Sequence, residues 1–402
     1  VLDRTGEGVH ARVDVRPYAD EDHDWWVLSD LTPGLDGAPV AVTAEHVLGI
    51  SPASSSLAQL TVREPVATAL DLGTGCGVQS LHLAQHTGTV VATDVNPRAL
   101  RMARLNALLA EVDVDVRDGS LFEPVAGERF DLVVSNPPFV VSPATAERLV
   151  YRDSGLPGDE LVRRLLTEAP GHLAEGGRAQ VLANWVHRRG ETWQDRLSGW
   201  LAGRGCDVWA VQREVADVAE YTELWLKDAG LHGGPAYAET YDAWLAWFEE
   251  QGVEAVGFGW LDLRRVDREP VLRLEEWPFE VEQPLGPQVA DRARRTDWLA
   301  ATSDEALTAA RLTARVDVRQ ETQGAPGAAD PETIVLRQQR GLRRARRADT
   351  VEAGLVGACD GDLTVGQILD ALAQLLAEDP ADLRRDRVPA VRELVAEGFL
   401  VP

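Results

Sequence analysis

The sequence predicts an α/β fold, in which a doubly wound, mostly parallel sheet of seven strands is joined by smaller flanking segments. Strand and helix patterns alternate from residue 67 onward, and the first four strands are apolar runs of about five residues. Each of these four runs ends in a polar residue or loop. Because ligands bind beyond the carboxyl ends of the strands in such sheets, we expect the four polar ends to meet in one crevice.

The composition describes an ordinary globular chain. Its 402 residues favour two or three domains, with 45% hydrophobic and 26% charged residues. No run reaches the roughly 18 apolar residues of a membrane span, and no signal pattern opens the chain. The cysteines Cys76, Cys206 and Cys359 are far apart, which favours a reducing, cytoplasmic location. The first residue is Val rather than Met, so we expect a further piece upstream.

The formal net charge of −25 excludes one broad class of function. So acidic a surface repels phosphate backbones at long range, so we expect no general affinity for nucleic acid. A local basic patch remains able to dock RNA or an acidic protein.

Four regions follow one another along the chain. Residues 1–46 are β-rich: an alternating stretch at 9–15 and the apolar run at 25–28 predict a β-hairpin, as the end of a truncated domain or as a platform. Residues 47–275 contain the sheet. Residues 276–331 form a connecting region, and residues 332–402 a C-terminal domain.

The elements of the sheet domain follow from apolar periodicity and end signals. Asn96 and Pro97 open one helix as N-cap and first helical residue. Glycines at 176 and 177 stop another. We expect strands at 67–72, 89–93, 112–116, 130–134, 178–184, 207–213 and 253–264. Helices are expected at 78–86, from 97, and at 160–173, 192–202 and 237–251.

The C-terminal domain is expected to be winged-helix-like, because short helices precede a final strand. Helices are predicted at 350–359, 365–376 and 388–397, with Thr364 capping the second. An apolar strand at 399–401 follows. In the connecting region the patterns predict a helix at 304–311 and a strand at 314–319.

The first strand runs into a glycine-rich loop that indicates an adenosyl-binding site. Glycines allow a sharp turn and a close approach of the backbone to a ligand. Asp94, at the end of the next strand, can accept hydrogen bonds from both ribose hydroxyls. Asp118, after the third strand, can accept one from an adenine amino group. The predicted cofactor residues are Asp71, Gly73, Thr74, Gly75, Cys76, Gly77, Asp94, Val95, Asn96, Asp118, Gly119 and Ser120.

A dinucleotide site is the main rival, and the glycine spacing argues against it. The fingerprint Gly-x-Gly-x-x-Gly requires a third glycine where this chain has Val78 or Ser80. S-adenosyl-L-methionine has no pyrophosphate, and the acidic Asp71 suits its cationic amino and sulfonium groups. We therefore predict S-adenosyl-L-methionine as the cofactor.

The fourth strand opens into the tetrapeptide Asn136-Pro137-Pro138-Phe139. An amide or nucleobase amino nitrogen is a poor nucleophile, so a site that methylates it must accept both N–H groups and hold the plane. The Asn136 side chain and the Pro137 backbone supply two carbonyls, which the prolines hold in place. Phe139 supplies a face for stacking. These four residues are the predicted catalytic residues, and a turn with Asn as a local cap is the simpler alternative.

The glycine loop, Asp94 and the tetrapeptide together resemble class I S-adenosylmethionine-dependent methyltransferases, over residues 47–230. The nearest branch includes release-factor glutamine methyltransferases and ribosomal RNA guanine amino-methyltransferases. The resemblance implies a Rossmann-like methyltransferase sheet, cofactor binding by the loop and Asp94, and target binding by the tetrapeptide. Two departures stand out: Phe139 replaces a common Tyr, and Asn184-Trp185 stands where the glutamine enzymes commonly have an acid.

The substrate class stays open at this point. A protein glutamine amide, in a translation factor for example, and an exocyclic amine in RNA both fit a planar nitrogen acceptor. The alternative of a different class is a non-catalytic module that binds S-adenosylmethionine, RNA or protein.

Three weaker features complete the sequence. A basic run at 337–347 could contact RNA or an acidic partner, or it could pair with the protein's own carboxylates. If the run is helical, four of its arginines (340, 343, 344 and 347) share one face of the helix. His82 and His86, four apart, are expected on a solvated helix face rather than at a metal. Residues 151–153 could line the substrate entrance or fill a loop. The arginines of the run are Arg337, Arg340, Arg343, Arg344, Arg346 and Arg347.

Overall fold

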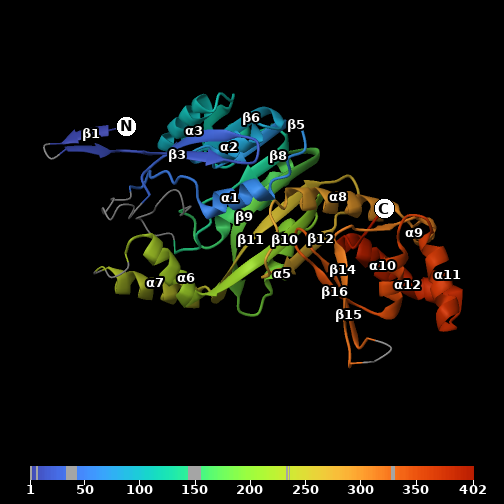
Figure 1. Cartoon of the computed structure of the whole chain (residues 1–402). Coiled ribbons are helices and arrows are strands. Elements are labelled where there is room, and N and C mark those ends of the chain that lie inside the picture. The colour runs from blue at the N-terminus through green and yellow to red at the C-terminus, as the bar shows by residue number, and fades with distance from the viewer. Residues whose placement is uncertain are drawn as a thin grey trace. The chain divides into compact units, whose positions relative to one another are not determined.

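The computed structural model describes residues 2–5, 8–32, 43–143, 155–231, 234, 236–326 and 331–402. It divides into two compact units, Val1–Pro278 and Phe279–Pro402, which Figure 1 colours from blue to yellow and from orange to red. Tyr151, Arg152 and Asp153 lie outside the described residues.

The first unit is built on a sheet of eight strands in the order β12-β10-β11-β9-β8-β5-β6-β7. All neighbours pair in parallel except β11, which runs antiparallel to β9 and β10. The predicted mostly parallel sheet is confirmed. The strands are β5 Val66–Leu72, β6 Thr87–Asp94, β7 Asp115–Asp118, β8 Phe130–Ser135, β9 Leu173–Arg188, β10 Cys206–Asp217, β11 Val253–Arg265 and β12 Leu272–Glu276.

The expected number of seven strands was wrong, because β12 adds an eighth. It pairs in parallel with β10 at the edge of the sheet, from Leu272 to Glu276. Its sequence, Leu-Arg-Leu-Glu-Glu, is short, charged and at most half-buried. A strand of this kind gives no buried apolar run, so it is formed by pairing with an existing edge.

Helices cover both faces of the sheet. Leu70 and Leu72 of β5 share a core cluster with residues of α4 and α5. The intervening Asp71 bonds instead to Ser80 of α2. Because successive side chains of a strand point to opposite faces, α2 lies across the sheet from α4 and α5. The helices are α1 Pro52–Leu60, α2 Val78–Leu83, α3 Pro97–Leu109, α4 Glu160–Glu168 and α5 Trp193–Leu201.

The N-terminal segment forms two hairpins rather than the single one expected. Strand β1 (Leu2–Thr5) pairs with β2 (Gly8–Ala11), and β3 (Asp14–Ala19) pairs with β4 (Asp24–Ser29). The buried Trp25 and Val27 of β4 join a core cluster with residues of α2 and α3. The alternation of β4, with every second residue buried, accounts for this packing.

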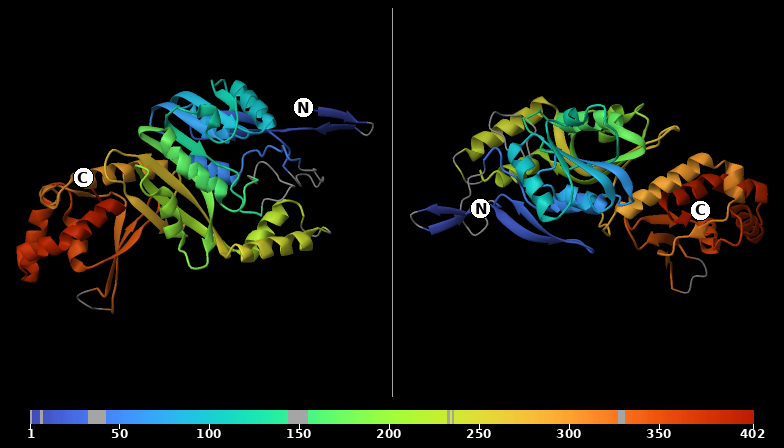
Figure 2. Two further views of the ribbon diagram at one scale, coloured as in Figure 1. Left: turned by 180° about the vertical axis from the view of Figure 1, so that it is seen from behind. Right: turned by 90° about the horizontal axis from the view of Figure 1, so that it is seen from above.

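A helical insertion separates β10 from β11. It consists of α6 (Val218–Asp228) and α7 (Tyr237–Glu250). Because β10 runs in the same direction as β9, α6 starts at the carboxyl edge of the sheet. Figures 1 and 2 show both helices at the end of the long strands β10 and β11.

The second unit begins earlier than the expected C-terminal domain, so residues 276–331 contain folded elements. Strands β14, β15 and β16 form an antiparallel sheet, and β13 pairs with β17. Helix α12 starts eight residues before its expected start at 388, because Asp379 caps it and Pro380 occupies its first turn. The elements are α8 Gly286–Ala301, α9 Asp304–Ala309, β13 Thr313–Ala314, β14 Val318–Gln323, β15 Thr333–Gln338, β16 Ala345–Ala348, α10 Thr350–Ala358, α11 Val365–Leu376, α12 Pro380–Glu397 and β17 Leu400–Val401. The winged-helix-like assignment stays a prediction.

The basic run lies on β15, a turn and β16, so the helix considered for it is not formed. Arg337 pairs with Glu321 at 2.7 Å, and Arg340 with Glu282 at 3.3 Å. Arg346 lies within 2.9–3.4 Å of Glu352, Glu393 and Glu397. For these three arginines the structure favours the alternative in which the run pairs with the protein's own carboxylates, and contact with RNA stays a prediction.

A buried ion pair between β9 and β11 should contribute to the stability of the first unit. Arg178 Nη1 donates to both carboxylate oxygens of Asp262, at 2.8 and 2.7 Å, and the two side chains are 10% and 9% exposed. We expect Asp262→Ala to lower the free energy of unfolding by about 3–5 kcal/mol in urea titrations, because it leaves a buried guanidinium unpaired. Arg178→Met combined with Asp262→Leu should recover most of the loss. A single variant as stable as the wild type would contradict this.

Candidate functional site

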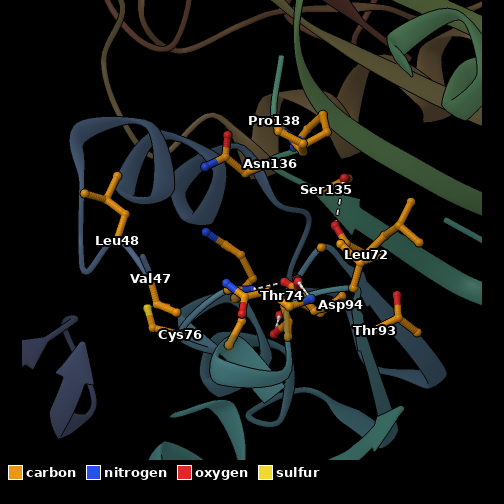
Figure 3. Close-up of a pocket in the computed structure, with 18 of the residues that line it drawn as sticks. Val47, Leu48, Leu72, Thr74, Cys76, Thr93, Asp94, Ser135, Asn136 and Pro138 are labelled. Atoms are coloured by element: carbon orange, nitrogen blue, oxygen red, sulfur yellow. Dashed lines mark hydrogen bonds between the residues drawn. The ribbon is translucent and has the colours of Figure 1, made fainter. Parts of the chain in front are cut away.

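A cavity of about 340 Å³ lies at the carboxyl edge of the sheet. The ends of β5, β6 and β8 contribute to its lining, together with Gly119 and Ser120 directly after β7, so the structure brings the carboxyl ends of these four strands together. Figure 3 shows Asn136 and Pro138 on one side of it, with Thr74, Cys76 and Asp94 on the other.

Most of the predicted residues line this cavity, and three do not. Gly77, Asp118 and Phe139 are outside the lining. Phe139 instead packs against the main core cluster of the sheet, and Asp118 is exposed at the end of β7. The predicted residues that line the cavity are Asp71, Gly73, Thr74, Gly75, Cys76, Asp94, Val95, Asn96, Gly119, Ser120, Asn136, Pro137 and Pro138.

The glycine loop is attached to the end of β6. The amides of Gly73 and Thr74 both donate to the carbonyl of Thr93, each at 2.9 Å. Gly73 and Gly75 have φ values of +75° and +57°, and a Cβ on either would meet nothing within 4 Å. Their backbone therefore requires glycine and leaves open space for a ligand to approach.

Gly77 serves packing instead of ligand access. It caps α2 with φ +88°, and a Cβ there would lie 3.1 Å from the Cα of Ala103 in α3. Its lack of a side chain lets the loop approach α3 closely.

Asp71 is a buried carboxylate directly beneath the loop. Its Oδ2 accepts hydrogen bonds from Thr74 Oγ1 at 2.6 Å, Ser80 Oγ at 2.7 Å and Ser80 N at 3.0 Å. Burial nevertheless raises its pKa from 3.8 to about 6, against the lowering effect of these bonds. A cationic group in the cavity would stabilise the ionised form.

Asp94 holds the opposite side of the loop. Its Oδ2 accepts from the Gly75 amide at 2.9 Å and its Oδ1 from the Asn96 amide at 2.8 Å. Burial raises the pKa of Asp94, and the charge of Asp118 adds to the increase. Each carboxylate oxygen keeps acceptor capacity for a hydroxyl.

Asn136 follows β8 and faces the cavity. Its side-chain oxygen Oδ1 is buried and has no hydrogen-bond partner among the described residues. The preceding Ser135 fixes the strand end, since its Oγ donates to the Leu72 carbonyl at 2.8 Å, as Figure 3 shows. A buried acceptor without a partner costs about 1–3 kcal/mol, which a bound N–H donor would offset.

Sequence reasoning missed one wall of the cavity, formed by residues 46–49 with Ser51 and Ser54. Asp30 holds this wall, since it accepts from the Val47 amide at 2.9 Å and pairs with Arg98. Asn96 Nδ2 adds a bond to the Glu45 carbonyl at 2.9 Å. The available signal was the serine-rich stretch at 51–56, whose hydroxyls equally suit the capping of a helix.

Two smaller expectations also change. His82 was expected on a solvated helix face, but it is buried and lies 2.8 Å from the Tyr18 hydroxyl. Burial lowers its pKa to about 4. Neither residue of the Asn184-Trp185 pair lines the cavity; Asn184 donates to the Tyr221 hydroxyl at 3.3 Å, and Trp185 donates to Gln212 at 2.9 Å.

The described part of the chain has neither a membrane-spanning helix nor a cluster of metal ligands. No helix in it has the length and apolar character needed to cross a membrane. In the same residues, no three His, Cys, Asp or Glu side chains are grouped so as to hold a metal ion.

Residues 49–197 match the family described as methyltransferase small domain. Residues 291–402 match a domain of unknown function, DUF7782. The ends of β5, β6 and β8 and most of the cavity lining fall within residues 49–197, so this part of the chain is similar to a methyltransferase small domain.

Three relatives are similar over this part of the chain. A putative protein N5-glutamine methyltransferase of Methanocaldococcus jannaschii is 32% identical over 128 residues, 31% of this chain and 64% of that protein. The release factor glutamine methyltransferase of Deinococcus radiodurans is 37% identical over 34% of this chain and 54% of that protein. The ribosomal protein uL3 glutamine methyltransferase of Bradyrhizobium diazoefficiens is 35% identical over 33% of this chain and 44% of that protein. The chain thus spans about half the length of the curated relatives it matches.

The raised pKa of Asp71 predicts a pH-dependent stability. A carboxyl with a pKa of 3.8 when unfolded and about 6 when folded binds more protons in the folded state, so stability falls as the pH rises between these values. Relative to Asp71→Asn, which cannot titrate, the wild type should lose roughly 3 kcal/mol of unfolding free energy between about pH 4 and pH 7. Urea titrations of both proteins measure this difference, and parallel pH profiles would contradict it.

Proposed function

We propose that this protein is an S-adenosylmethionine-dependent N-methyltransferase that acts on a glutamine side-chain amide of a cytoplasmic protein. The observation that carries the proposal is the buried Asn136 Oδ1, which has no hydrogen-bond partner among the described residues and belongs to a side chain that lines the cavity opposite the glycine loop. This oxygen would accept a hydrogen bond from an N–H group of a planar amide. The three relatives above carry names of glutamine methyltransferases, which favours a protein amide over a nucleobase.

The residues of the cavity fit S-adenosylmethionine. A volume of about 340 Å³ is within the range of small-molecule sites. Asp71 would face the cationic amino-acid part, Asp94 the ribose hydroxyls, and the backbone of Gly73 and Gly75 leaves room for close approach. A diphosphate fits poorly, because two carboxylates already flank the loop.

When bound, S-adenosylmethionine supplies an electrophilic methyl group on a sulfonium centre. The chain's own part is to orient the acceptor. Asn136 and the Pro137 carbonyl accept the two N–H groups, which holds the amide plane so that its nitrogen faces the methyl group. With the amide held in this way, bound S-adenosylmethionine would supply the methyl group to its nitrogen, and water would take the proton that the nitrogen then loses. Positioning and oriented dipoles therefore account for catalysis, without a strong base.

Electrostatics support a protein substrate. The net charge of −25 opposes a phosphate backbone, and Arg337, Arg340, Arg343 and Arg346 of the basic run already have carboxylate partners. Phe139, which we expected to stack on the acceptor, packs against the core. Stacking by Phe139 would need this ring to turn toward the cavity, so we assign target binding to Asn136 and Pro137.

Asp94→Ala should weaken cofactor binding strongly. Loss of two charge-assisted hydrogen bonds predicts a Kd for S-adenosylmethionine roughly 30- to 1,000-fold higher by isothermal titration. Asp113→Ala, the same change at an exposed aspartate outside the lining, should leave the Kd within about twofold. NADH should give no heat. Binding of NADH, or equal Kd values for both variants, would overturn the cofactor assignment.

Asn136→Ala should separate binding from transfer. We expect methyl transfer to fall by at least about 100-fold, because the acceptor amide loses a hydrogen bond made by a positioned group, while the Kd for S-adenosylmethionine stays within about threefold. The assay is tritiated-methyl labelling of an extract from cells that lack the protein. Protease, and not nuclease, should release the label. Label released by nuclease would place the acceptor in RNA, and full transfer by the variant would refute the role of Asn136.

A further inference from the structure

The catalytic tetrapeptide is fixed at its start by the sheet. Ser135, the last residue of β8, pairs with Leu72 of β5 and Val181 of β9. The next residues cannot be held in the same way, because Pro137 and Pro138 have no backbone N–H to donate. A tether beyond the prolines is therefore needed to hold Asn136 and the Pro137 carbonyl in one orientation.

Tyr221 of α6 provides this tether. The backbone N–H of Val141, two residues after Phe139, donates to the Tyr221 hydroxyl at 2.8 Å. Asn184 of β9 donates to the same oxygen at 3.3 Å. Val141 and Tyr221 are both 0% exposed, so water does not compete for the bond.

The position of the hydroxyl is itself fixed by the insertion that carries it. The Tyr221 ring packs edge-on against Phe248 of α7 and is tilted against Phe258 of β11, with centroids 6.2 and 5.6 Å apart. Asp217 caps α6 by accepting from the Ala219 and Glu220 amides at 2.8 and 2.9 Å. Val140 and Val141 belong to the same buried cluster as Tyr221. The position of the far end of the catalytic segment therefore depends on the insertion between β10 and β11.

We infer that Tyr221 is a positioning residue for methyl transfer, which acts by holding the Asn136–Pro137 acceptor pair in register through the Val141 amide. This inference rests on the proposed function. Misplacement of a reacting group by about 1 Å can cost about 100-fold in rate. The cofactor contacts come from other elements, so loss of the tether should change the rate of transfer and leave cofactor affinity unchanged.

The test compares Tyr221→Phe with Thr222→Val in the full chain. Both remove one buried hydroxyl from neighbouring positions of α6. Among the described residues, however, the Thr222 hydroxyl bonds within its own helix, to the Val218 carbonyl at 2.6 Å. Initial rates of tritiated-methyl transfer to the extract are measured across S-adenosylmethionine concentrations. For Tyr221→Phe we expect a maximal rate roughly 10- to 100-fold lower with an unchanged KM for the cofactor. For Thr222→Val the maximal rate and the KM for the cofactor should both stay within about twofold of the wild-type values.

Equal maximal rates for Tyr221→Phe and the wild type would overturn the inference. Equal losses in both variants would also overturn it, because they would show a general effect on α6. A wild type that transfers no methyl group would instead refute the proposed function.

Hydrogen exchange tests the tether without any substrate. In Tyr221→Phe the Val141 amide should exchange at least about tenfold faster, while the β8 amides keep their protection. An unchanged exchange rate at Val141 would overturn the inference even if activity fell.

Discussion

Parallel pairing of β5 with β6 and β8 is the constraint on which the site depends. Parallel strands have their carboxyl ends at one edge, so the loops that follow them must open on the same side. The pairing places Leu72 beside Thr93 and beside Ser135, residues that are far apart in the chain. Two short bonds complete the junction: the Gly73 amide donates to Thr93, and the Ser135 hydroxyl donates to Leu72.

The electrostatics of the cavity follow from burial without a matching cation. Asp71 and Asp94 both have raised pKa values, chiefly because each is removed from water, and both flank the glycine loop. Their hydrogen bonds to loop amides and hydroxyls offset part of this cost and shape the loop. The remaining cost favours a ligand that carries positive charge and hydroxyl donors, and it disfavours a second anion.

The side of the cavity formed by residues 136–138 is organised differently from the side formed by the glycine loop. Asn136 Oδ1 has no hydrogen-bond partner among the described residues, and the two prolines have no backbone N–H group with which to join the ladder. Order in this segment must come from its ends, through β8 at one side and the aromatic cluster around Tyr221 at the other. The insertion between β10 and β11 therefore helps to hold the segment that follows β8, although none of its described residues lines the cavity.

Much of the sheet and nearly half of the cavity lining could be read from the sequence, because these parts depend on local signals. The apolar runs, the glycine loop and the Asn-Pro-Pro segment are each contiguous in the sequence. The alternation of strands and helices gives the order in which they follow one another. The residues that were missed or misplaced depend on contacts between distant segments. Strand β12 forms only because β10 offers an edge, and the wall at 46–49 stands only because Asp30 reaches the Val47 amide. His82 is buried by an N-terminal strand more than sixty residues away, Phe139 turns into the core, and Tyr221 meets Val141 across eighty residues. Such partners carry no periodicity of their own, since burial and hydrogen bonding are properties of the assembled chain, so only the tertiary structure decided them.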